Sequence, residues 1–155
     1  MFKFNKKKKG SSKNTPQPLF YFDEILDMID IANGAFYQKN ESFILIISSD
    51  KHEDVLQIIN KNMAEETSEN PNEFGISLSL EFDTEEESDL NNIKKLKQHK
   101  NFGSFIKRED ENLMYFTLLL PHDSEQAASI CSSIMTDVFG NKKNDQVRGD
   151  FYEIE

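Results

Sequence analysis

The segment from Phe74 to Asp83 reads FGISLSLEFD, and it decides the fold of this chain. Apolar side chains alternate there with small or charged ones at every second position. This alternation is typical of a β-strand that buries one face. No other segment predicts a strand as clearly. Helices and hairpins are predicted on both sides of it, so the strand stands where two similar halves of the chain meet.

Downstream of this strand, the sequence predicts a helix, a hairpin, a second helix and a last strand. Thr84 and Glu87 are spaced as a capping box, and the following helix has acids in its first turn and lysines in its last. Strands are predicted at 103–108 and 113–120, a helix from Asp123 to Gly140, and a strand at 146–154. From about 74 to 154 this is the order of a ferredoxin-like βαββαβ unit, an antiparallel sheet with the helices on one face.

Upstream, the same order is predicted about 70 residues earlier, with a strand at 19–22, a helix at 23–33, strands at 35–39 and 42–49, and a helix at 50–66. Gly34-Ala35-Phe36 and Gly103-Ser104-Phe105 open the two hairpins. We therefore expect an α+β fold in which the unit at 74–154 follows a related, incomplete (β)αββα copy at about 19–66. Either one continuous sheet shares the strand at Phe74, or the first copy is a truncated unit that leans on the second.

Two predicted strands are apolar on both faces, at Phe43 to Ile47 and Leu113 to Leu120. A sheet with helices on one side exposes its other face to water, so these strands predict a second cover. That cover is either the other half of the chain or a second subunit. A homodimer is therefore one of the expected assemblies.

Charge divides the chain into an arm and a body. Residues 1–18 hold six lysines and no acid, whereas the remainder holds 12 basic and 28 acidic residues. We expect 1–18 to be a flexible basic arm and 19–155 a single compact α+β domain of two halves, 19–73 and 74–155. Because the acidic body repels phosphate, nucleic acid is an unlikely partner.

The arm predicts a membrane contact of its own. Its aromatic rings and lysines are suited to weak attachment to an anionic membrane surface, through Phe2, Lys3, Phe4, Lys6, Lys7, Lys8 and Lys9. No apolar run has the length of a membrane helix, and the basic start lacks the apolar core of a secretory signal. We therefore expect a cytoplasmic protein.

Residues that could carry chemistry are few. His52 and His122 stand at comparable places in the two halves, where a strand passes into a helix, and are weak site candidates. Cys131 is expected to be a buried, inert thiol, and His99 a surface residue beside lysines. No spacing matches a metal-binding, phosphate-binding or catalytic motif, so no catalytic residue, cofactor or metal is predicted.

Three function classes fit these observations. The first is a non-catalytic interaction or regulatory protein, of adaptor or inhibitor type, whose partner is another protein. The second is a small-ligand sensor that binds between the two halves, and the third is an enzyme without a familiar motif. In each case, the groove between the halves is the expected place for a site.

Overall fold

A computed structural model describes residues 20–34, 42–50, 55–60, 75–142 and 145–153. Within these residues the chain forms three α-helices, a 3₁₀ turn and one antiparallel sheet with the strand order β1-β7-β2-β3-β4-β6-β5. The elements in chain order are β1 (Phe20–Phe22), α1 (Ile25–Gly34), β2 (Phe43–Ser49), β3 (Leu56–Asn60), β4 (Ile76–Asp83), α2 (Glu87–Lys97), η3 (Phe102–Ser104), β5 (Ile106–Asp110), β6 (Leu113–Leu119), α3 (Ser124–Asp137) and β7 (Val147–Glu153). The predicted α+β class with an antiparallel sheet is confirmed.

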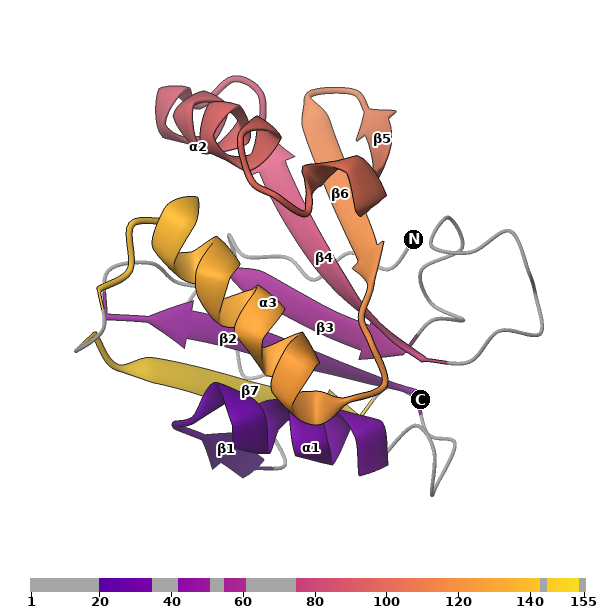
Figure 1. The fold of residues 1–155 in the computed structure, drawn as a ribbon. Coiled ribbons are helices and arrows are strands. Elements are labelled where there is room, and N and C mark those ends of the chain that lie inside the picture. Colours follow the sequence, from indigo (N-terminus) through magenta and orange to yellow (C-terminus); the bar gives the residue numbers. More distant parts are fainter. Residues whose placement is uncertain (1–19, 35–41, 51–54, 61–74, 143–144, 154–155) are drawn as a thin grey trace, which may run out of the picture.

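The three helices pack on one face of the sheet, as Figure 1 shows. The buried core cluster joins alternate residues of the strands to residues of all three helices: Phe43, Leu45, Ile58, Leu78, Phe116 and Phe151 meet Met28, Ile29, Ile93, Leu96, Cys131 and Ile134. Alternate strand residues point to the same face, so this core lies between the sheet and the helices. Phe43 stacks on Phe151 across the β2–β7 pair, with ring centroids 5.3 Å apart.

The strand predicted at Phe74 to Asp83 is β4, and it lies inside the sheet. It pairs with β3 on one side and β6 on the other, so one continuous sheet shares it. Its expected solvent face is nevertheless buried, because Ser77 is 0% and Ser79 is 4% exposed. The prediction of one wet face for this strand was wrong.

The strand order differs from the four-stranded sheet expected for residues 74–154. β7 pairs with β1 and β2, so the β2–β3 hairpin lies between β7 and β4. The two halves are therefore side by side in one sheet among the described residues, and the described helices of one half do not cover the second face of the other. Ile44, Ile46 and Ile59, which point to that second face, are at most 2% exposed in a single chain.

The helix predicted at 50–66 is wrong where the structure describes it. Leu56–Asn60 is β3, a strand between β2 and β4 with every residue buried. A strand buried on both faces has no polar alternation, so its apolar residues also fit helical spacing. Asp50, predicted to cap that helix, instead accepts the backbone N–H of Gln146 at 3.3 Å. The (β)αββα copy thus ends in a strand, and its predicted strand at 35–39 lies outside the described residues.

Other differences are local. The strand predicted from Gly103 starts at Ile106, after the 3₁₀ turn η3. The capping box at Thr84 does not form, because the Thr84 hydroxyl donates to the carbonyl of Asn112 in the β5–β6 turn. The cap predicted at Asp123 is confirmed, since its carboxylate accepts the N–H of Gln126 at 2.9 Å.

Among the described residues, no helix has both the length and the apolar character that crossing a membrane requires.

Candidate functional site

The predicted site residues do not come together in the described part of the chain. His122 lies exposed in the turn before α3. His52 and the arm residues from Phe2 to Lys9 lie outside the described residues. Cys131 is fully buried in α3, where desolvation raises the pKa of its thiol to about 12. The thiol therefore stays protonated near neutral pH, in agreement with its predicted inertness.

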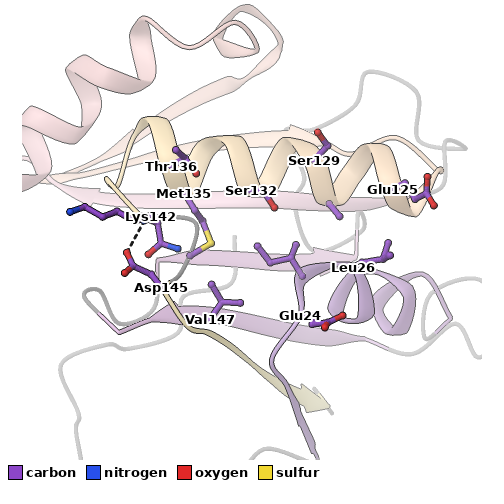
Figure 2. Close-up of a pocket in the computed structure, with 13 residues that line it drawn as sticks. Glu24, Leu26, Glu125, Ser129, Ser132, Met135, Thr136, Lys142, Asp145 and Val147 are labelled. Atoms are coloured by element: carbon purple, nitrogen blue, oxygen red, sulfur yellow. Dashed lines mark hydrogen bonds between the residues drawn. The ribbon is translucent and has the colours of Figure 1, made fainter.

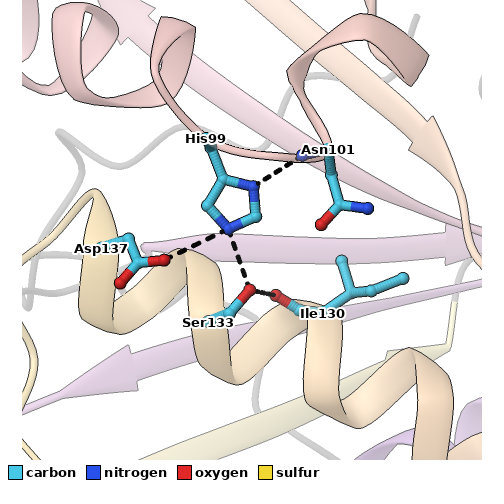
Figure 3. Close-up of polar contacts among 5 residues, drawn as sticks. All are labelled: His99, Asn101, Ile130, Ser133 and Asp137. Carbon is cyan, nitrogen blue, oxygen red and sulfur yellow. Dashed lines mark hydrogen bonds and ion pairs between the residues drawn. The ribbon is translucent and has the colours of Figure 1, made fainter.

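His99 was expected on the surface and is buried instead, with its side chain 1% exposed. It lies in the turn after α2, and its ring enters a polar contact with α3 (Figure 3). Nε2 is 2.9 Å from Oγ of Ser133 and 3.6 Å from the Asp137 carboxylate. A serine, a histidine and an aspartate thus meet, which raises the question of a catalytic triad.

The hydrogen bonds around His99 do not have triad geometry. In a triad, the serine and the aspartate bind different ring nitrogens, whereas Ser133 and Asp137 both face Nε2. Nδ1 accepts the backbone N–H of Asn101 at 3.1 Å, so the ring proton is on Nε2 and is donated to Ser133. Ser133 in turn donates to the Ile130 carbonyl at 3.0 Å. His99 therefore fastens the turn after α2 to α3, which is a structural role.

The groove that we identify as the candidate site lies between α1 and α3, above the start of β7. The two helices run antiparallel, because the Asn33 amide at the end of α1 donates to the Ser124 hydroxyl at the start of α3 at 2.9 Å. α1 has 10 residues and α3 has 14, so α3 extends past the start of α1 by about 6 Å at about 1.5 Å per residue. The uncovered end of α3 forms one wall of the groove.

The groove is open to solvent, has a volume of about 660 Å³ and is lined by both halves of the chain. The first half contributes the segment that starts α1, and the second half contributes α3, the turn after it and the start of β7. Figure 2 shows the lining residues, which are Glu24, Ile25, Leu26, Glu125, Ala128, Ser129, Ser132, Met135, Thr136, Asn141, Lys142, Asp145 and Val147. This is the place between the halves where a site was expected.

One face of α3 lines the groove with short polar side chains. Glu125, Ser129, Ser132 and Thr136 follow one another at helical spacing, so they lie along the same side of the helix. The hydroxyl groups of Ser129, Ser132 and Thr136 can donate or accept hydrogen bonds, and the small size of these three side chains leaves the groove open. Sequence periodicity did not single them out, since exposed serines on a helix ordinarily indicate only a solvated face.

The floor of the groove is apolar and its rim is acidic. Met135 and Val147 lie at the floor, and Leu26 stands 38% exposed on the α1 side. Among the lining residues three carboxylates, from Glu24, Glu125 and Asp145, outnumber the single amine of Lys142. Exposed acids of the α1 region, Asp23, Asp27 and Asp30, add to this charge. The site can therefore hold apolar groups that carry positive charge beside them.

Asn141 gives the groove a buried polar group. Gly140, at φ +71°, turns the chain after α3, and Asn141 then donates its backbone N–H to the Met135 carbonyl at 2.9 Å. Asn141 is 8% exposed, and its Oδ1 has no hydrogen-bond partner among the residues that the structure describes. A buried acceptor without a donor costs about 1–3 kcal/mol, which a bound donor can recover.

Comparison of the chain with protein-family models, with curated proteins and with solved structures finds no match. Among the described residues, no group of three or more His, Cys, Asp or Glu side chains is placed to hold a metal ion.

Proposed function

We propose that this protein is a non-catalytic interaction or regulatory protein, of adaptor or inhibitor type, that acts in the cytoplasm. Its partner is another protein, which places an apolar segment with flanking lysines or arginines in the α1–α3 groove. The observation that carries this proposal is the combination of an apolar floor with a net-negative rim. Apolar contacts in such a groove supply affinity, and the rim charges orient the partner and speed its association.

The fold contributes to this proposal by bringing both halves to the groove. In our proposal, residues 74–154 are a ferredoxin-like unit into which the β2–β3 hairpin has been inserted between the last strand and the first. Because of that insertion, α1 of the first half lies beside α3 of the second. A partner in the groove then contacts both halves at once.

The test is affinity capture from native extract with three full-length proteins: the wild type, Ser129→Arg and Gln126→Arg. Both substituted positions are exposed on α3, but only Ser129 lines the groove. We expect the wild type and Gln126→Arg to capture a protein that Ser129→Arg does not capture. With that partner purified, the Kd of Ser129→Arg should be at least about tenfold higher than the Kd of the wild type. Circular dichroism checks that both variants keep the wild-type fold. If all three proteins capture the same set equally, the groove is not the docking site.

A second candidate function is a small-ligand sensor. The groove volume of about 660 Å³ falls in the range of small-molecule sites, roughly 300–1,000 Å³, and Asn141 offers an unpaired acceptor. A ligand at about 100 times its Kd stabilises a protein by about 2.7 kcal/mol, so a thermal-shift screen of metabolites can detect it. A stabilising metabolite whose effect disappears in Ser129→Arg supports the sensor, and a screen without any stabilisation counts against it.

A further inference from the structure

We infer that the basic arm at residues 1–18 is itself an occupant of the α1–α3 groove, so that the arm and a partner compete for one site. This inference rests on the proposed function of the groove and adds its regulation. It also gives Phe2, Phe4 and the lysines of the arm a role within the chain. The arm lies outside the described residues.

Charge complementarity is the first argument. The arm carries six lysines and no acid, against 28 acidic and 12 basic residues in the rest of the chain. Acids line the groove and occupy exposed positions at the start of α1: Asp23, Glu24, Asp27, Asp30, Glu125 and Asp145. Exposed charges act over about 8 Å at physiological ionic strength. The arm therefore meets an attractive field as soon as it approaches α1.

Shape and polarity are the second argument. In an extended segment, side chains two residues apart point the same way, so Phe2 and Phe4 share one side and Lys3 takes the other. Two rings on one side match the apolar floor, where Met135 offers a thioether that packs well against aromatic rings. Lysines on the other side and after Phe4 face the acidic rim.

Reach is the third argument. The arm joins the fold at β1, and Glu24, which lines the groove, is only two residues beyond the end of that strand at Phe22. The residues between Phe4 and Phe20 span up to about 50 Å when extended, at about 3.3 Å per residue, so Phe2 and Phe4 can fold back to the groove. Attachment within the same chain gives an effective concentration on the order of millimolar, so weak contacts suffice for occupancy.

Paramagnetic relaxation in the full-length protein tests the inference. A nitroxide label is attached at Asn5→Cys, which keeps both phenylalanines, while buried Cys131 stays unlabelled. We expect the label to reduce the amide signals of Ser129, Ser132 and Thr136 at least about twofold, while those of α2, over another part of the sheet, change less. The effect should vanish in Ser129→Arg and at high salt, and persist in Gln126→Arg. Wild-type protein treated with the same label is the control for Cys131.

Several results would overturn the inference. Equal signal loss in the groove and in α2, or signal loss that Ser129→Arg leaves unchanged, shows that the arm does not occupy the groove. If the groove signals stay unaffected while the protein floats with phosphatidylserine vesicles at low salt, the arm is a membrane tether instead. Each of these results contradicts the binding of the arm but not the proposed function, provided that Ser129→Arg still prevents capture of the partner. If the arm contacts the groove but Ser129→Arg captures the partner normally, only the proposed function is contradicted.

Discussion

Gly149 is the position where one added methyl group tests the packing of α1 on the sheet. It lies in β7 opposite Ile47 and Phe22, and its backbone passes directly under Met28 of α1. A Cβ at residue 149 would be 2.5 Å from Sδ, 2.8 Å from Cγ and 3.1 Å from Cε of Met28. Carbon atoms pack best at about 3.5–4.0 Å, and Met28 is fully buried in the core, so a Cβ at residue 149 would overlap a packed side chain. Gly149→Ala must therefore displace the Met28 side chain or move α1 away from β7.

The expected destabilisation follows from two opposing effects. Overpacking of a core costs about 1–3 kcal/mol, and replacing glycine by alanine at a compatible backbone conformation recovers about 0.4–1 kcal/mol from the unfolded state. We expect the free energy of unfolding of Gly149→Ala to fall by about 1–2 kcal/mol, which corresponds to a Tm roughly 2–8 °C lower for a chain of this size. Urea unfolding, with the midpoint and the slope fitted separately, measures the change.

A double-mutant cycle with Met28→Ala isolates the cause. Met28→Ala alone should cost about 2–5 kcal/mol, but it removes all three clashing atoms, so Gly149→Ala should then be neutral or slightly stabilising. Gly103→Ala is the matched control, because a Cβ there meets nothing within 4 Å. The reasoning is refuted if Gly149→Ala matches Gly103→Ala, or if it costs the same with and without Met28.

Two further predictions concern buried polar and ionisable groups. His99→Ala should lower the free energy of unfolding by about 2–4 kcal/mol, because it leaves a cavity and an unpaired Asn101 N–H. Asp137→Asn, at a side chain 59% exposed, should change the free energy of unfolding by less than about 0.5 kcal/mol. Equal destabilisation by the two variants in thermal denaturation would contradict the assigned hydrogen bonds. Burial raises the pKa of the Cys131 thiol from 9.0 to about 12, so the unfolded chain loses this proton first and stability should fall as the pH rises from about 9 to about 12. Cys131→Ala should flatten that decline in urea titrations at pH 8 to 11, and an unchanged slope would exclude the thiol as its source.

Much of the fold could be predicted from sequence because most helices and strands have a recognisable pattern in their own residues. The alternation around Leu78, the cap at Asp123 and the apolar stripe of α3 each predicted an element that the structure contains. The failure at β3 has a physical cause. Leu56 and Ile59 fit a helical stripe, and only the pairing of this segment between two other strands, β2 and β4, makes it a strand. That information is non-local, and periodicity does not contain it.

The sequence predicted that a site would lie between the two halves, but it did not predict which residues line it. Its side chains are serines, a threonine, an asparagine and acids, which are ordinary surface residues until two helices bring them together. The burial of His99 could not be predicted from the sequence either. Its neighbours Lys97 and Lys100 indicated the surface, but the turn after α2 brings the ring against α3, where it donates a hydrogen bond to Ser133. Neither outcome follows from residue types alone.

The position of β7 is what turns a helix layer into a groove. A last strand paired with β4 would place α3 toward the α2 side of the sheet, whereas pairing with β2 and β1 brings α3 alongside α1. Once these helices are neighbours, their unequal lengths leave the last turn of α3 uncovered, and Gly140 turns the chain back to form the end wall. The hairpin β2–β3 between β7 and β4 is thus the structural origin of the groove. Any substitution that weakens the pairing of β2 with β7 should open the groove before it unfolds β4 and β6, since those strands pair with each other independently of β7.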